Sequence, residues 1–229
     1  STIGLAAAWM WQNDGPWGAP FGIALGVWLI AGAFSEIGYR VRLFRGATVA
    51  EAFGKARRLP RSAWGTAMAH AGVGVMVIGI VGITSWRVEV IEALAPGATF
   101  DVGSYAITFQ NVESYQGPNF RADRGSFLVE RNGKEIATLT PEKRVYPVSE
   151  MPTTEAAIYT IWVADLYVVL GDPTGTGAWT VRAYVNPLVP WVWIGAVIMV
   201  LGGMISLSDR RYRVGAPVRA RNAKPGVPA

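Results

Sequence analysis

His70 is the residue whose type and position are best suited to chemistry, because it is the only histidine and it lies in an uncharged apolar stretch, residues 64–86. A neutral imidazole donates a hydrogen bond from one ring nitrogen and binds a metal or a heme iron through the other. An ionisable side chain within a membrane segment usually marks a functional site. The position therefore indicates a ligand or a proton relay, and a hydrogen bond to a neighbouring helix is the alternative interpretation.

The surroundings of His70 favour a large flat ligand, because small residues would let a macrocycle lie against the helix. These residues are Gly65, Ala69, Ala71, Gly72, Gly74, Gly79 and Gly82. A heme iron held by two imidazoles needs a second histidine, and this sequence has none. The second ligand is therefore expected from another chain or from a segment outside this sequence.

Three stretches are apolar enough to be transmembrane helices: residues 17–39, 64–86 and 188–207. A helix of about 23 residues is about 34 Å long, and the hydrocarbon core of a bilayer is about 30 Å thick. Tryptophans stand at both ends of the second stretch, where indole rings prefer the headgroup region. The sequence therefore predicts three membrane-spanning helices.

Basic residues gather on one side of these helices, in the loop at 40–63 and in the tail at 208–229. Acidic residues outnumber basic ones in residues 87–187. This positive-inside pattern places the loop and the tail in the cytoplasm and residues 87–187 outside, and it does not resemble a nucleic-acid footprint. His70 then lies about 9 Å from the inner end of its helix. Residues 1–16 are an outer segment or the end of a truncated helix, and the chain is interpreted as the end of a longer protein.

Residues 87–187 have the pattern of an all-β domain. Asn132-Gly133 predicts a type I′ hairpin turn, because both residue types tolerate positive φ. Apolar and polar residues alternate on either side of this turn, as in strands with one buried face. The expected strands cover residues 104–109, 126–130, 134–139, 157–163, 166–170 and 179–185. We therefore expect a membrane α-helical protein with an inserted small antiparallel β barrel or sandwich on the outer face.

Several short motifs occur in a defined order along the second half of the chain. After Ala69-His70-x-Gly72 come Glu142-Lys143-Arg144-x-Tyr146, Thr154-Glu155-x-x-Ile158, Asp165-Leu166-Tyr167-x-x-Leu170-Gly171, Trp179-x-x-Arg182-x-Tyr184-x-Asn186-Pro187-Leu188-Val189, Trp193-x-Gly195, Gly202-Gly203 and Ser206-Leu207-x-Asp209-Arg210-Arg211. In this order they closely resemble the C-terminal part of the cytochrome c-type biogenesis protein CcmF family, over about residues 17–213.

The resemblance implies a cytochrome c heme lyase, or holocytochrome c synthase, of the bacterial inner membrane. This region would be one part of a larger assembly and is not expected to be active alone. That family carries a membrane heme b held by two histidines, and His70 matches the second of them. No catalytic residue is assigned, because the family's tryptophan-rich heme-handling segment has no counterpart in this sequence.

The resemblance also implies a set of partners. They are the remainder of the CcmF-like protein with the second heme ligand, a heme chaperone, a thiol-handling apocytochrome chaperone, apocytochrome c and membrane lipid, without nucleic acid. Heme attachment joins vinyl groups to the thiols of the substrate, so a chain without cysteine is compatible with this activity.

Four residues of the outer domain place cations beside aromatic rings and are candidates for contacts to heme propionates or to a partner chain. They are Lys143, Arg144, Tyr146 and Arg182. Salt bridges on the strand surface are the alternative interpretation. A different function is also open, a non-enzymatic membrane scaffold whose β domain docks partner subunits. A quinol-oxidising b-type subunit would need histidine pairs within its own spans, and this sequence has a single histidine.

Overall fold

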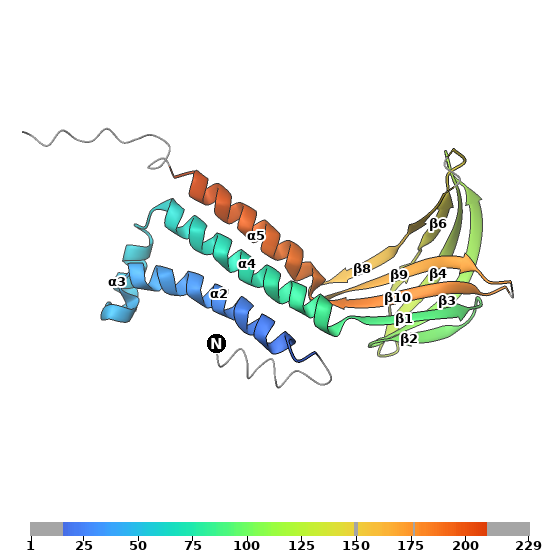
Figure 1. Ribbon diagram of the computed structural model, residues 1–229, viewed down its shortest axis with the longest axis horizontal. Helices are drawn as coiled ribbons and strands as arrows, with labels where there is room; N and C mark the ends of the chain where they lie inside the picture. The colour runs from blue at the N-terminus through green and yellow to red at the C-terminus, as the bar shows by residue number, and fades with distance from the viewer. Residues whose placement is uncertain (1–15, 149–150, 176, 210–229) are drawn as a thin grey trace, which may run out of the picture.

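The structure, a computed structural model, describes residues 16–148, 151–175 and 177–209. Three long helices form one end of the described molecule, and two β-sheets form the other (Figure 1). The helices are α2 (Ala19–Arg40), α4 (Arg61–Trp86) and α5 (Val189–Leu207), and each is long and apolar enough to cross a membrane. The predicted N-terminal segment before Pro16 and the basic tail after Asp209 lie outside the described residues.

Prolines mark where the long helices begin. Pro20 and Pro190 stand in the first turns of α2 and α5, and Pro60 immediately precedes α4. Proline suits the start of a helix because the N–H that it lacks would have no intrahelical partner there. α4 therefore begins at Arg61, three residues before the predicted stretch 64–86, and it can do so because a long arginine side chain can extend its charge toward water.

The basic segment between α2 and α4 contains a 3₁₀ turn, η1 (Leu43–Arg45), and one short helix, α3 (Val49–Ala56). A capping box starts α3, since the Glu51 N–H donates to Thr48 Oγ1 at 3.3 Å and the Thr48 N–H donates to Glu51 Oε2 at 3.0 Å. α3 carries exposed apolar side chains at Val49 and Phe53. This pattern is typical of a helix that lies on a membrane surface.

α4 lies between α2 and α5, and glycines let the three backbones approach closely (Figure 1). A Cβ atom on Gly72 would lie 2.8 Å from the carbonyl oxygen of Gly195 on α5. On the other side of α4, a Cβ on Gly74 would lie 2.6 Å from the carbonyl oxygen of Gly26 on α2. Close contact of small residues is the main source of helix association where no hydrophobic effect acts.

Gly195→Val is expected to weaken the pairing of α4 and α5, because a Cβ there would lie 2.6 Å from the Met76 backbone nitrogen and 2.7 Å from the Gly72 oxygen. Overpacking of this kind costs about 1–3 kcal/mol. The measurement is the midpoint of thermal unfolding of the full-length protein in detergent. Gly203→Val is the matched control, since nothing lies within 4 Å of a Cβ on Gly203. Equal midpoints for the two variants would contradict the prediction.

The β domain is a sandwich of two antiparallel sheets that follows α4 directly and leads directly into α5. One sheet has the strand order β1-β10-β9-β8 and the other β2-β3-β4-β6-β7, with β5 paired to β4. The strands are β1 (Val88–Leu94), β2 (Thr99–Val102), β3 (Tyr105–Gln116), β4 (Arg121–Arg131), β5 (Lys134–Leu139), β6 (Glu142–Val145), β7 (Pro152–Glu155), β8 (Ala157–Ile161), β9 (Ala164–Pro173) and β10 (Trp179–Pro187). The predicted antiparallel β domain is confirmed, and of the two expected arrangements, a barrel or a sandwich, it is the sandwich.

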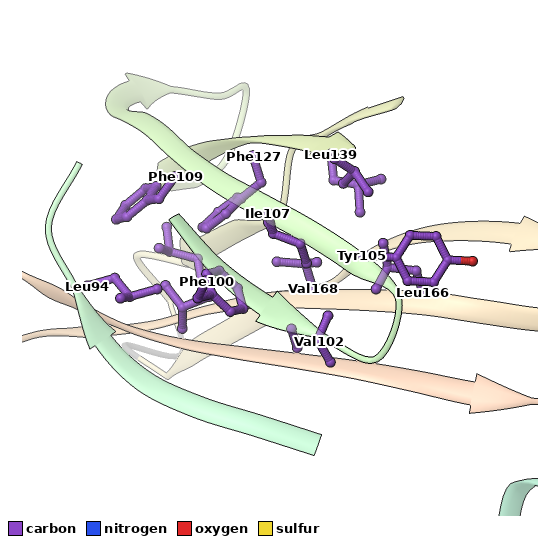
Figure 2. Close-up of a cluster of buried hydrophobic side chains, with 14 residues drawn as sticks. Leu94, Phe100, Val102, Tyr105, Ile107, Phe109, Phe127, Leu139, Leu166 and Val168 are labelled. Carbon is purple, nitrogen blue, oxygen red and sulfur yellow. The ribbon is translucent and has the colours of Figure 1, made fainter. Parts of the chain in front are cut away.

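The core of the sandwich is made of side chains that alternate along strands of both sheets (Figure 2). Phe109 on β3 and Phe127 on β4 stack with ring centroids 4.6 Å apart and planes 6° apart, and both are fully buried. Leu166 and Val168 on β9 supply the facing side of the core. The two sheets are therefore held together by one continuous apolar layer.

The predicted hairpin at Asn132-Gly133 is confirmed, with φ angles of 53° and 71°. The predicted strands differ from the observed ones in two ways: some strands were missed, and one was predicted too long. β1, β2, β6 and β7 were not predicted. β2, β6 and β7 are only four residues long, and β6 is mostly charged, so their alternation is weak. The expected strand 157–163 is also too long, since β8 ends at Ile161 and Trp162 and Val163 form a turn.

Candidate functional site

His70 lies on a side of α4 that neither α2 nor α5 covers. Thr66, His70, Ile80 and Thr84 are all exposed and share one face of the helix. The imidazole Nδ1 lies 2.8 Å from the carbonyl oxygen of Thr66, one turn earlier in the same helix. Since a carbonyl oxygen only accepts, this contact places the proton on Nδ1.

The tautomer of His70 leaves the lone pair on Nε2. Within residues 16–148, 151–175 and 177–209, Nε2 has no hydrogen-bond partner. An imidazole whose Nδ1–H is held by a carbonyl is the usual arrangement of a metal-ligating histidine, because the hydrogen bond fixes both the ring orientation and the tautomer. In this tautomer Nε2 is the ring nitrogen of His70 that remains available, and His70 is exposed on the open face of α4.

The small residues around His70 do not make the room for a ligand that the sequence suggested. Gly65, Gly72 and Gly79 contact α5, and Gly74 contacts α2. Their Cβ positions are taken by the backbones and side chains of these neighbouring helices rather than by open space. Any ligand of His70 therefore approaches over the exposed face, where residues such as Val73 and Val77 are only partly buried.

His70 is far from the cationic residues of the β domain. Sixteen residues of α4 separate it from Trp86, which is about 24 Å of helix, and the sandwich lies beyond that end (Figure 1). β6, which carries Lys143 and Arg144, lies toward the far side of the sandwich. The structure therefore separates His70 from this second group of predicted site residues.

The four predicted propionate or partner residues do not form one cluster. Arg144 pairs with Glu142 at 2.8 Å and stands over the ring of Phe120, with its Cζ 4.6 Å from the centroid. Lys143 forms an ion pair with Asp172. Tyr146 lies with Arg144, since both contact the ring of Phe120, whereas Arg182 is exposed on β10.

A buried carboxylate that the sequence did not single out as a site, Glu142, organises the polar end of this sheet. Glu142 is 6% exposed, and its two oxygens accept hydrogen bonds from Arg124 Nε at 2.6 Å, Arg144 Nε at 2.8 Å and the Tyr115 hydroxyl at 2.9 Å. The register of β4 and β6 places Arg124 directly opposite Glu142. Tyr115 and Arg124 lie 27 and 18 residues away in sequence, so only the pairing of β3, β4 and β6 could reveal the group.

Burial by itself would raise the pKa of Glu142, but the hydrogen bonds from Arg144, Arg124 and Tyr115 outweigh it, so its pKa lies below the ordinary value. A carboxyl group whose pKa is lowered by folding stabilises the folded state above its unfolded pKa of about 4.3. That contribution is lost as the pH falls through the folded pKa.

Glu142→Gln is expected to lower the free energy of unfolding by about 1.5–3 kcal/mol at pH 7, and this difference should shrink as the pH is lowered from 7 into strong acid, through the folded pKa of Glu142. The reason is that a protonated Glu142 no longer offers a carboxylate to Arg124 and Arg144. The measurement is thermal unfolding of the full-length protein in detergent across this range. Glu135→Gln, at an exposed position of β5, serves as the control. A difference between Glu142→Gln and wild type that stays constant with pH would contradict the interpretation.

Among the described residues, no group of three or more histidine, cysteine, aspartate or glutamate side chains is arranged to hold a metal ion. The metal-binding potential of this part of the chain therefore rests on a single imidazole. One axial ligand is what a heme iron takes from one helix, with the macrocycle supplying four nitrogens and a second axial ligand coming from elsewhere.

The fold is that of a membrane protein with three apolar helices and an antiparallel β-sandwich as its head domain. One imidazole is exposed on the middle helix. Residues 85–187 match the family model of the CcmF C-terminal beta-sandwich. The chain is a C-terminal CcmF-like region of the cytochrome c-type biogenesis proteins.

Two relatives show how far the similarity extends. The cytochrome c-type biogenesis protein CycK of Rhizobium meliloti is 45% identical over 226 residues, which cover 97% of this chain and 33% of the relative. CcmF of Pseudomonas aeruginosa is 40% identical over 223 residues, with 97% and 33% covered. The chain thus spans about a third of the length of the curated relatives that it matches.

A solved structure has the same fold. The cytochrome c heme lyase CcmF aligns with a TM-score of 0.71 over 90% of this chain and 33% of that chain, at 21% identity. This likeness supports the arrangement of three helices and a sandwich, and the sequence relatives identify the chain as CcmF-like.

Proposed function

We propose that this chain is the C-terminal region of a cytochrome c heme lyase and that His70 supplies one axial ligand of a membrane heme b. The observation that carries the proposal is the orientation of the imidazole, with Nδ1 held by the Thr66 carbonyl and Nε2 directed away from that contact on an uncovered helix face. A neutral imidazole in this tautomer is the normal axial ligand of a heme iron.

The residues around His70 suit such a group. The exposed face of α4 is apolar apart from Thr66, His70 and Thr84, and the Thr84 hydroxyl is occupied by a hydrogen bond to the Ile80 carbonyl at 2.8 Å. An apolar face can lie against a macrocycle without leaving polar groups unpaired. Bound there, a heme b would supply one-electron transfer, which could keep a delivered heme iron reduced.

The remainder of the CcmF-like protein would provide the second axial histidine. This chain has no second histidine, and relatives of the same family are about three times as long as the aligned region. The open face of α4 is where helices of that remainder would pack. The other partners that we propose are a heme chaperone, a thiol-handling apocytochrome chaperone and apocytochrome c.

The proposed orientation puts the β domain in the periplasm and the C-terminus in the cytoplasm of a bacterial inner membrane. The end of α2 at Arg40, the start of α4 at Arg61 and α3 in the basic segment between them lie at the end of the helices away from the sandwich (Figure 1). The positive-inside rule assigns such an end to the cytoplasmic face. The sandwich would then stand at the outer face, where it would support heme attachment to apocytochrome c.

The test is optical. A reduced-minus-oxidised spectrum of the purified full-length protein reports low-spin heme b, and it is compared between wild type and His70→Ala. Loss of the heme b bands supports ligation by His70. An unchanged spectrum would indicate that His70 serves helix packing only. It would favour the alternative function, a membrane scaffold whose β domain docks partner subunits.

A further inference from the structure

The turn between β8 and β9 has an unusual composition for a tight hairpin. Ile161 pairs with Ala164, so Trp162 and Val163 alone form the turn. Their side chains are 82% and 54% exposed. Two-residue hairpins favour Asn-Gly and similar pairs with positive φ, whereas neither Trp162 nor Val163 has a positive φ. The chain therefore places two large apolar side chains at a position where polar turn residues are the rule.

The turn is fixed to the start of α5 by two hydrogen bonds. The indole Nε1 of Trp191 donates to the Trp162 carbonyl at 3.0 Å, and the Leu188 N–H donates to the Val163 carbonyl at 2.8 Å. Leu188 precedes α5 in a left-handed conformation, with φ of 59°, which a leucine adopts only when its surroundings require it. The turn is therefore held level with the first residues of a membrane helix (Figure 1).

The helix ends beside the turn are rich in tryptophan and enclose an apolar cavity. Trp86 ends α4, and Trp193 in the first turns of α5 is 69% exposed. A cavity of about 390 Å³ is lined by Trp86, Val163, Pro187 and Leu188. Its lining is apolar and continuous with the turn, so the natural occupant is hydrocarbon rather than water or an ion.

We propose that the Trp162–Val163 turn inserts into the outer headgroup region of the bilayer and that lipid acyl chains reach the cavity beside it. Both α4 and α5 leave the hydrocarbon core at this level, and indole rings prefer the interface between hydrocarbon and water. The turn lies at the same level, because its carbonyls are bonded to residues at the start of α5. An exposed tryptophan there would contact lipid headgroups, as expected also for Trp86 and Trp193 at the helix ends.

The contact gives the β domain a third attachment to the membrane. The domain is joined covalently to α4 through β1 and to α5 through β10. The hydrogen bonds from Trp191 and Leu188 tie the β8–β9 turn to the start of α5, and the contact of this turn with lipid adds a direct attachment of the domain to the bilayer. The turn thus sets the height and tilt of the sandwich above the bilayer independently of any heme.

Site-directed spin labelling tests the insertion in the full-length protein reconstituted into phosphatidylcholine and phosphatidylglycerol nanodiscs. This chain has no cysteine, so Val163→Cys carries the only label once cysteines outside it are replaced by serine. Collisions with oxygen, which partitions into the bilayer, are compared with collisions with a nickel chelate, which stays in water. Gly175→Cys is the control, because Gly175 is exposed beyond the opposite end of β9, about 33 Å away along the strand.

We expect the ratio of oxygen to nickel collisions to be severalfold higher at position 163 than at position 175. Trp162→Asp in the Val163→Cys background should lower that ratio toward the control value, since it places a charge in the turn that inserts into the headgroup region. A water-like ratio at position 163 overturns the proposal. Exclusion of both reagents also overturns it, because another part of the full-length protein would then cover the turn.

Discussion

His70→Ala is expected to abolish the bands of low-spin heme b in the full-length protein while the protein stays in the membrane at its normal level. The methyl group of alanine cannot bind iron, and the structure describes no other histidine beside α4 that could replace it. The helix itself should persist, because alanine is a better helix former than histidine and position 70 lies outside both helix contacts. The measurement is the reduced-minus-oxidised spectrum at matched protein concentrations.

Two controls separate loss of a ligand from damage to the helix. Thr84→Ala changes another polar residue on the same exposed face of α4 and should leave the spectrum unchanged. Imidazole added to His70→Ala should restore part of the low-spin spectrum, because it can enter the space that the side chain leaves. Full retention of the heme b bands in His70→Ala would contradict the assignment of His70 as an axial ligand. Loss of heme in Thr84→Ala as well would show that the face, rather than the imidazole, is being disturbed.

Phe127→Ala is expected to lower the free energy of unfolding of the β domain by about 3–5 kcal/mol, because a fully buried aromatic ring is removed from a packed core. The loss includes the stacking contact with Phe109, whose ring lies parallel at a centroid distance of 4.6 Å. The measurement is hydrogen exchange of the β3 and β4 amides, followed by mass spectrometry in the detergent-solubilised full-length protein. The slowest amides should exchange roughly 150- to 5,000-fold faster than in wild type.

Ile91→Ala is the control for this core substitution. Ile91 lies on β1 of the same domain, but its side chain is 50% exposed, so removing it should have a much smaller effect. The heme b spectrum of Phe127→Ala is a second comparison with wild type. It should be unchanged, since His70 lies in the helices and away from this core. If Phe127→Ala accelerated amide exchange as little as Ile91→Ala does, the layer of Phe109 and Phe127 would not be what holds the two sheets together.

Local features of the sequence were enough to predict the elements that carry their own signal. The apolar stretches of α2, α4 and α5 are visible because crossing a bilayer requires about 20 consecutive apolar residues. The hairpin at Asn132-Gly133 is visible because a tight turn with positive φ limits which residues can form it. His70 stands out because a single ionisable side chain in such a stretch is costly.

Features that depend on distant pairing were not predictable. The hydrogen bonds from Arg124 and Tyr115 to Glu142 exist only because β3, β4 and β6 lie side by side in a particular register. The turn at Trp162 and Val163 was mistaken for strand, since two apolar residues after an alternating run look like its continuation. β6 was not predicted as a strand, because three of its four residues are charged. Of the two interpretations offered for Arg144, the salt bridge is present, since Arg144 pairs with Glu142 and Glu155.

The sequence by itself determined three apolar helices, an intervening β domain and one imidazole in the middle helix, because hydropathy, alternation and residue type are local properties. Tertiary structure alone decided which face of α4 stays open and what the small residues around the imidazole contact. Those small residues pack against α2 and α5, whereas the hydrogen bond from Nδ1 to the Thr66 carbonyl forms within α4 itself. Which face of a helix is covered depends on where its neighbours pack, and the packing of neighbours is set by contacts between segments far apart in the chain.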